Sequence, residues 1–251
     1  EDFCFEEFAD RVAELVEKHV NIDRLLELTK PVATAVVPIS AGRHIYKREP
    51  SFPIAVACDP AFNFVYEANI RYLHHLGEVT YFSPLADTSL PDAGFVYLPG
   101  GYPELYLAAL SANRQMLQSI RRYVESGGKL LAECGGMMYL CDEIRDKNGD
   151  VYPMAGVLHQ SATMENMKLR LGYRTLLYNE TRLKGHEFHY SRLVEQQNPL
   201  PSCAVAYTAK GVETDTPLYH YKNVWAGYTH LYWADPVGNE WFTKFVIDGN
   251  T

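Results

Sequence analysis

The pattern of apolar and polar positions changes near residue 52. Before it, residues 3–30 place Phe, Val and Leu side chains at helical spacing, which predicts one or two amphipathic helices, the second capped by Asp23. Residues 31–51 are rich in Pro and small residues and lack periodicity, which is typical of a linker. Because an isolated pair of helices cannot bury its apolar face, we interpret residues 1–51 as the tail of a preceding domain plus a linker.

Strands and helices alternate from residue 52 onward, in the domain that we assign to residues 52–251. Short β-branched and apolar runs predict buried strands at 54–58, 79–82, 94–98 and 129–133. Helical spacing predicts helices at 64–76, ending at Gly77, and at 103–110 and 112–126. Strands separated by such helices form βαβ units, so the predicted fold class is α/β with a doubly wound, mainly parallel sheet. Residues 150–235 are expected to add antiparallel strands.

Composition narrows the class of protein. With 47% hydrophobic and 22% charged residues, the 251-residue chain is typical of a globular protein that buries a sizeable core. A net charge of −8 and a pI near 5.6 argue against sequence-independent binding of nucleic acid, which needs patches of Lys and Arg. No apolar run reaches the roughly 18 residues of a membrane span. The acidic start resembles no signal peptide.

The cysteines bear on the cellular location. They are odd in number and form no CxxC pair, which fits neither a zinc site nor a disulfide framework and favours a reducing cytoplasm. The five are Cys4, Cys58, Cys134, Cys141 and Cys203. The chain begins at Glu1 rather than Met, which favours a processed or truncated polypeptide.

The segment KLLAECGGMMYL, residues 129–140, carries the strongest chemical signal. A predicted strand ends at Glu133, Cys134 follows, and Gly135-Gly136 opens an apolar helix, which is the layout of a nucleophile elbow. Partial positive charge at the helix N-terminus and nearby backbone N–H groups favour a thiolate. Cys134 is therefore a candidate nucleophile and the Gly135 N–H a candidate oxyanion donor. The alternative is that Cys134 is a small core residue.

A second glycine turn lies upstream, in FVYLPGGYPELY, residues 95–106. A predicted strand ends at Leu98, the turn contains Gly100 and Gly101, and Pro103 begins a helix, where its missing N–H costs nothing. Backbone N–H groups in such a turn could supply a second oxyanion donor. The alternative is an ordinary loop.

A cysteine nucleophile needs a base that takes up the thiol proton and later protonates the leaving group. His74 and His75 lie on a predicted helix, far from the carboxyl ends of the strands. Four other histidines remain candidates, and residue spacing does not choose among them: His159, His186, His189 and His230.

Charged residues gather in two further segments. GHEFHYSRL, residues 185–193, favours a substrate-facing strand that presents Glu187 and His189, because a metal site there would lack a third, distant ligand. No metal is therefore predicted. In MKLRLGYRTL, residues 167–176, Arg170 and Arg174 could bind carboxylates bidentately, or be solvated charges on a strand face.

Four motifs follow one another along the chain: LPGGYPELY, LLAECGGMMYL, GHEFHYSRL and GYTHLYW, with LGYR in support. Through them the chain resembles class I, or triad-type, glutamine amidotransferases, which have a flavodoxin-like fold. Within that class it resembles the cobyrinic acid a,c-diamide synthase family. The resemblance covers residues 52 to about 247, and residues 1–30 resemble the end of that family's N-terminal ATPase domain.

The resemblance implies roles for the matching positions. Cys134 matches the glutaminase nucleophile and His230 the catalytic histidine. The remaining matches are the oxyanion and glutamine-binding glycines Gly100, Gly101 and Gly135, and the substrate-facing positions Tyr102, Glu104, Glu187, His189 and Arg170. Many triad amidotransferases carry Glu two residues after the histidine, where this chain has Tyr232. The resemblance therefore implies a Cys-His dyad and leaves no evident acid to orient His230.

The implied reaction is amidation of the a- and c-acetate carboxylates of cobyrinic acid, with ATP and Mg²⁺ activating each carboxylate and glutamine supplying ammonia. No phosphate-binding GxxxxGK[ST] loop occurs in the chain, so ATP and Mg²⁺ are assigned to the full-length enzyme and no cofactor to this fragment. The implied partners are glutamine, a corrinoid substrate and the N-terminal ATPase domain, with no nucleic acid or membrane. A homodimer is compatible with the sequence, and weak or undetectable activity is expected of the fragment alone.

Other functions stay open at this point. The chain could amidate another tetrapyrrole, as in the nickel-sirohydrochlorin or cobyric acid type of amidotransferase. It could also be a thiol protein of similar fold with a redox or chaperone role, or a catalytically silent binding domain.

Overall fold

The computed structural model describes residues 5–29, 52–197 and 199–248. Contacts divide the chain into two units, Glu1–Lys47 and Arg48–Thr251. The predicted linker, residues 31–51, lies outside the described residues.

The first unit contains two helices, α1 (Phe5–His19) and α2 (Ile22–Leu28). The cap of α2 is Asn21 rather than Asp23, because the Asn21 side chain accepts a hydrogen bond of 2.9 Å from the Arg24 N–H. Neither helix buries a residue; the side chains of Phe5 and Leu15 are 70% and 63% exposed. The amphipathic pair predicted from the sequence is therefore present, with large apolar side chains exposed on both helices.

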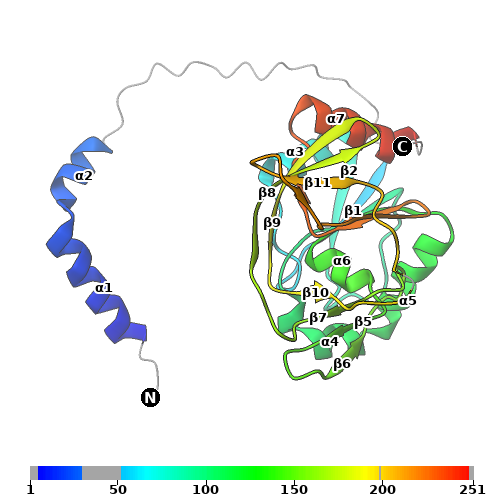
Figure 1. Ribbon diagram of the computed structural model, residues 1–251, viewed down its shortest axis with the longest axis horizontal. Coiled ribbons are helices and arrows are strands. Elements are labelled where there is room, and N and C mark those ends of the chain that lie inside the picture. The colour runs from blue at the N-terminus through cyan, green and yellow to red at the C-terminus, as the bar shows by residue number, and fades with distance from the viewer. Residues whose placement is uncertain (1–4, 30–51, 198, 249–251) are drawn as a thin grey trace. The chain divides into compact units, whose positions relative to one another are not determined.

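A six-stranded sheet forms the centre of the second unit (Figure 1). Its strands, in spatial order, are β13 (Leu218–Tyr221), β14 (Val224–Gly227), β4 (Lys129–Glu133), β3 (Phe95–Leu98), β1 (Pro53–Ala57) and β2 (Glu78–Phe82). All neighbours pair in parallel except β13 and β14. The predicted mainly parallel sheet is therefore confirmed.

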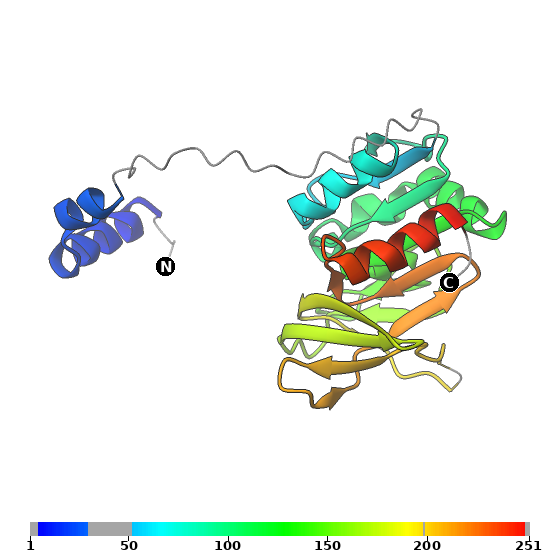
Figure 2. The ribbon, with the colours of Figure 1, turned by 90° about the horizontal axis from the view of Figure 1, so that it is seen from above.

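Helices cover both faces of this sheet. Successive side chains of a strand point to opposite faces, so Ile54 and Val56 of β1 join one apolar layer and Ala55 the other. One layer is completed by α3 (Glu67–Leu76) and α7 (Pro236–Thr243, followed by a π-helical turn, Lys244–Asp248), which lie side by side in Figure 2. The other is completed by a 3-10 turn (Pro103–Leu105), α4 (Leu107–Ala112), α5 (Arg114–Glu125) and α6 (Gly135–Leu140). The doubly wound arrangement is confirmed.

The start of α3 differs from the prediction. The apolar pattern placed a helix from residue 64, but the helix begins at Glu67 because the Phe64 N–H is bonded to the Gly100 carbonyl at 3.0 Å. This bridge brings the segment before α3 against the glycine turn after β3. At the other end, Gly77 follows the helix in an extended rather than a left-handed conformation.

The other strands after α6 form two more sheets. A five-stranded antiparallel sheet has the order β12 (Glu213–Thr214), β11 (Val205–Thr208), β8 (Arg170–Tyr178), β9 (Thr181–His189) and β15 (His230–Leu231). A four-stranded sheet has the order β10 (Arg192–Leu193), β7 (Ser161–Thr163), β5 (Glu143–Arg145) and β6 (Val151–Pro153). The added antiparallel strands are as predicted. No helix in the described part of the chain is long and apolar enough to span a membrane.

Candidate active site

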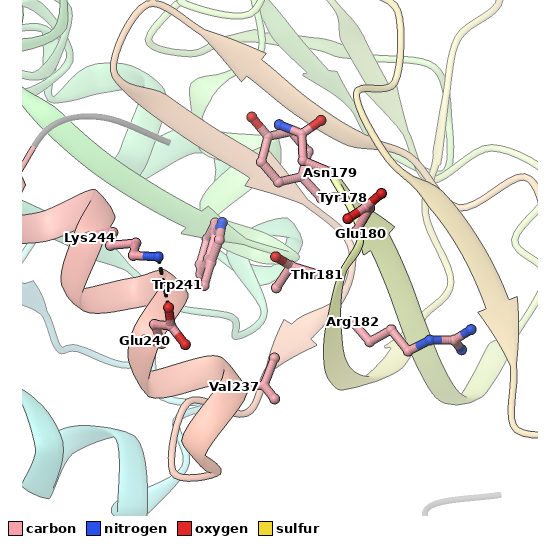
Figure 3. Close-up of a pocket in the computed structure, with 9 residues that line it drawn as sticks. All are labelled: Tyr178, Asn179, Glu180, Thr181, Arg182, Val237, Glu240, Trp241 and Lys244. Atoms are coloured by element: carbon pink, nitrogen blue, oxygen red, sulfur yellow. Dashed lines mark hydrogen bonds and ion pairs between the residues drawn. The ribbon is translucent and has the colours of Figure 1, made fainter.

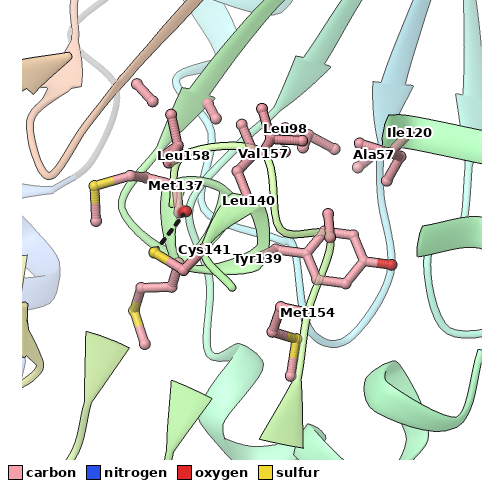
Figure 4. Close-up of a cluster of buried hydrophobic side chains, with 14 of the residues drawn as sticks. Ala57, Leu98, Ile120, Met137, Tyr139, Leu140, Cys141, Met154, Val157 and Leu158 are labelled. Carbon is pink, nitrogen blue, oxygen red and sulfur yellow. Dashed lines mark hydrogen bonds between the residues drawn. The ribbon is translucent and has the colours of Figure 1, made fainter. Parts of the chain in front are cut away.

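Cys134 lies on a tight turn between β4 and α6, at the carboxyl edge of the parallel sheet. Its backbone has φ 49° and ψ −104°, outside the conformations that non-glycine residues favour. The turn is held by a 2.7 Å bond from the Cys134 N–H to the Gly227 carbonyl, and α6 anchors it through buried apolar side chains (Figure 4). A Cβ on Gly136 would lie 2.1 Å from the Leu98 carbonyl oxygen, so only glycine fits there. The elbow predicted from Cys-Gly-Gly is confirmed in its geometry.

The two glycine turns meet beside Cys134. A Cβ on Gly135 would lie 3.2 Å from the Gly101 nitrogen and 2.8 Å from Pro103 Cδ, so the loops after β4 and β3 are in contact. The Gly135 N–H is directed toward the Cys134 sulfur. The Gly101 backbone nitrogen lies on the facing loop, against Gly135. The two glycine turns that the sequence offered as oxyanion donors are therefore packed together, one residue from the thiol.

His230 comes from β15 and lies against the Gly100 turn. A Cβ placed on Gly100 would lie only 2.1 Å from His230 Cε1. The His230 ring also packs on the Phe64 ring, with 4.3 Å between the ring centroids. The side chain is buried, and its Nδ1 has no hydrogen-bond partner among the described residues. Of the histidines that sequence spacing left open, His230 is therefore the one packed against the Gly100 turn.

Glu133, the residue before the nucleophile, is a part of this site that the sequence reasoning missed. Its buried carboxylate accepts hydrogen bonds from the Tyr97 hydroxyl at 2.7 Å and from the Leu231 N–H at 3.0 Å. Its Oε2 lies 4.0 Å from His230 Nδ1. The available signal was a charged residue at the end of an otherwise apolar strand, since a buried carboxylate needs specific partners.

Burial favours the neutral form of each ionisable group at this site. It raises the pKa of the Cys134 thiol to about 12, with Glu104 adding to the effect, whereas the Gly135 N–H opposes it. Burial also lowers the pKa of His230 to about 3 and raises that of Glu133 to about 8. Desolvation therefore outweighs the helix N-terminus, contrary to the expectation of a thiolate: burial keeps the Cys134 thiol protonated and the His230 imidazole neutral at pH 7.

Comparison with known proteins decides the family. Residues 53–237 match the CobB/CobQ-like glutamine amidotransferase domain. The chain belongs to this family. It is 37% identical over 236 residues to a cobyrinate a,c-diamide synthase of Picrophilus torridus, covering 89% of this chain and 49% of the relative. It is 40% identical over 185 residues to a hydrogenobyrinate a,c-diamide synthase of Pseudomonas aeruginosa, covering 71% of this chain and 41% of the relative. The chain thus spans about half the length of the curated relatives that it matches.

A solved structure supports the fold independently of close sequence similarity. The structure of PurLQS from Thermotoga maritima aligns with a TM-score of 0.50 at 16% identity, over 78% of this chain and 96% of that one. This likeness confirms the predicted fold, and the family match over residues 53–237 confirms the prediction of a glutamine amidotransferase domain.

In this CobB/CobQ-like domain, the GHEFHYSRL segment forms a buried polar network on β9. Glu187 pairs with Arg174, accepts a hydrogen bond from the Thr216 hydroxyl at 3.0 Å and lies 2.8 Å from His189 Nε2. The His189 ring stacks on Tyr228 at 3.7 Å. Burial alone would raise the pKa of Glu187, but His189, Arg174 and Thr216 together hold it below its ordinary value.

This network borders a pocket of about 350 Å³ that also contains Arg170. Arg170 forms an exposed ion pair with Asp215. The pocket is linked to the elbow through β9, because the Cys134 sulfur lies 3.8 Å from the Phe188 carbonyl oxygen. The structure thus brings Arg170, Glu187 and His189 together, close to but separate from the Cys134 turn.

Tyr102 and Glu104 lie on the loop after β3 instead. Tyr102 is exposed, and its N–H is bonded to the Ala61 carbonyl at 3.0 Å. Burial raises the pKa of Glu104 above its ordinary value. Neither residue lines the pocket that contains Arg170.

Another pocket of the domain, about 560 Å³, lies between the β8–β9 turn and α7 (Figure 3). Its lining includes Arg182, Trp241 and the Lys244–Glu240 ion pair, but no predicted site residue. Across the described part of the chain, no group of three or more His, Cys, Asp or Glu side chains could hold a metal ion.

Proposed function

We propose that this chain hydrolyses glutamine to glutamate and ammonia, with Cys134 as nucleophile and His230 as base. The observation that carries the proposal is that the strained Cys134 turn and the buried His230 ring pack on the same glycine turn, the first through Gly101 and the second through Gly100. A nucleophile on an elbow and a base on one shared turn are the parts that acyl transfer requires.

The chemistry follows from the neutral resting state. As the sulfur of Cys134 attacks the side-chain amide carbon, His230 accepts the thiol proton, and the Gly101 and Gly135 N–H groups bind the oxyanion. Collapse of the tetrahedral intermediate breaks the C–N bond, and His230 returns the proton to the departing ammonia. Water then attacks the thioester carbon, with His230 again as base; the C–S bond breaks, glutamate leaves, and His230 returns the proton to the Cys134 sulfur.

We further propose that the ammonia amidates the a- and c-acetate carboxylates of a corrinoid. Support comes from the names of the relatives, cobyrinate and hydrogenobyrinate a,c-diamide synthase, which make cobyrinate and hydrogenobyrinate the two candidate substrates. Since the chain has no phosphate-binding loop, carboxylate activation by ATP and Mg²⁺ belongs to a separate N-terminal domain. Arg170, Glu187 and His189, together with Tyr102 and Glu104, are proposed to face substrate.

Glutamate release from glutamine tests the proposal, measured for wild type and for Cys134→Ala. The variant removes the attacking sulfur, so glutamate release should fall to the uncatalysed background. Because glutaminase domains commonly depend on their partner domain, a weak wild-type rate is expected, and the assay needs high protein concentration. Equal release by both proteins would overturn the mechanism.

A further inference from the structure

Two groups hold the Glu133 carboxylate in place. The Tyr97 hydroxyl comes from the neighbouring strand β3, and the Leu231 N–H comes from β15, one residue after His230. The second bond ties the carboxylate to the strand that carries the histidine. Glu133 also directly precedes Cys134, so the end of β4 carries both the nucleophile and the acid.

His230 needs a partner on its Nδ1 side. To accept a proton from the Cys134 thiol, the neutral ring must present an unprotonated Nε2, which requires the hydrogen on Nδ1. That Nδ1 is buried and has no hydrogen-bond partner among the described residues, and Glu133 Oε2 lies 4.0 Å away. Contacts of this kind are often long before substrate binds and shorten in the reactive complex.

The position that carries Glu in many triad amidotransferases does not supply this partner. Tyr232 occupies it, is 40% exposed and packs edge-on against the Tyr66 ring. Tyr232 therefore does not bring a carboxylate to His230, the group that orients the imidazole in a triad.

We propose that Glu133 is the positioning residue for His230, directing Nδ1–H toward its carboxylate and Nε2 toward Cys134. The inference rests on the proposed glutaminase function. It replaces the Cys-His dyad expected from the sequence with a triad whose acid comes from the residue before the nucleophile. When His230 takes up the thiol proton, the ionised carboxylate stabilises the imidazolium.

The ionisation of Glu133 gives this arrangement a pH dependence. Burial raises the pKa of Glu133 to about 8, so the carboxylate accepts the Nδ1 hydrogen fully only above that pH. The groups that face the pair are Cys134, Tyr66, Tyr97, His186, His189 and Glu187. Of these, the two tyrosines and the buried thiol stay protonated at pH 8, because burial raises the pKa of each of them.

The test replaces the carboxylate with a neutral group of the same shape, Glu133→Gln, in the 251-residue chain. Glutamate release should lose about 10²- to 10⁴-fold in kcat with little change in KM, since the variant alters the base and not the glutamine contacts. The wild-type rate should rise with pH through about 8, as the carboxylate ionises, and the rise should be absent in the variant. Tyr232→Phe is the matched control and should keep the wild-type rate and pH profile.

Ring ¹⁵N NMR of His230 supplies a readout that does not depend on turnover. Wild type at pH 9 should show the Nδ1–H tautomer, changing with a midpoint near pH 8, whereas Glu133→Gln should show no such transition. An identical tautomer and pH response in the two proteins, or an unchanged kcat, would overturn the positioning role. Glutamate release that survives Cys134→Ala would instead overturn the proposed function, so the two failures are distinguishable.

Discussion

The two sides of the candidate site are held by different forces. On the parallel-sheet side, backbone packs on backbone: glycines after β3 and β4 leave no room for a Cβ beside Cys134. On the antiparallel-sheet side, β9 is fixed by a buried network of Glu187, Arg174, His189 and Thr216. The first side therefore depends on the absence of side chains, and the second on paired charge. We therefore expect an added methyl group to damage the first side and the loss of a charged side chain to damage the second.

Among substitutions that separate the two sides, Gly100→Ala on the backbone-packed side is expected to have the largest effect. The new methyl group would lie 2.1 Å from His230 Cε1, so the ring must move. Displacement of a catalytic group by about 1 Å can reduce the rate on the order of 100-fold, and we expect a loss of at least that size in glutamate release. Gly211→Ala is the control: alanine is strained at its φ of 76°, which lowers stability, but a Cβ there meets nothing within 4 Å, so glutamate release by the folded variant should not change. Wild-type activity in Gly100→Ala would show that His230 does not act from this position.

A smaller effect, on stability, is expected from Glu187→Ala on the charged side. The substitution leaves Arg174 and His189 buried without their partner, and breaking such a pair costs about 3–5 kcal/mol. Urea denaturation measures the change in the free energy of unfolding. A change below about 1 kcal/mol would mean that the network does not hold β9.

The sign of the pH dependence provides a second check on Glu187. Its partners hold its pKa below the ordinary value of 4.5, so its stabilising contribution is present above pH 4.5 and is lost as the pH falls through the lower, folded-state pKa. Wild type should therefore lose stability relative to Glu187→Gln as the pH drops below 4.5.

The exposed ion pair of Arg170 with Asp215 is the matched control for stability and should give the smallest effect. Its side chains are 41% and 73% exposed, against 10% and 1% for Arg174 and Glu187. Exposed pairs contribute about 0–1 kcal/mol, so Arg170→Ala should change the free energy of unfolding by less than 1 kcal/mol. A loss of stability above 1 kcal/mol would contradict the expected difference between the exposed and the buried ion pair.

The two sides also differ in how far the sequence predicts them. The strand ending at Glu133, the Cys134 turn and the helix from Gly135 are contiguous, so local patterning was sufficient to place the nucleophile. His230 reaches the site through the pairing of β15 with β9, where it lies opposite His186, 44 positions earlier in the chain (230 − 186 = 44). Such pairing has no local signature. Only the family motif selected this histidine.

The predictions that were wrong or incomplete share one physical origin, because each depends on contacts with residues that are distant in the sequence. Residue 64 had helical spacing, yet its N–H is bonded to the Gly100 carbonyl. Glu133 was read as the end of a strand, because its partners Tyr97 and Leu231 lie 36 and 98 positions away. The prediction of a thiolate at Cys134 did not include desolvation, because desolvation depends on all the groups that pack around the sulfur in the folded chain.

The central claim, that Cys134 is the glutamine-attacking nucleophile, is most directly tested by mass-spectrometric mapping of a glutamine-mimicking diazo-ketone on the intact chain. Among the described cysteines, Cys58 is exposed, Cys134 and Cys141 are buried and Cys203 is intermediate. A reagent whose reactivity depended only on solvent accessibility would modify Cys58. We predict a stoichiometric adduct on Cys134, blocked by excess glutamine and abolished by Cys134→Ala. An adduct on Cys58 with Cys134 unmodified, or no adduct at all, would contradict the account.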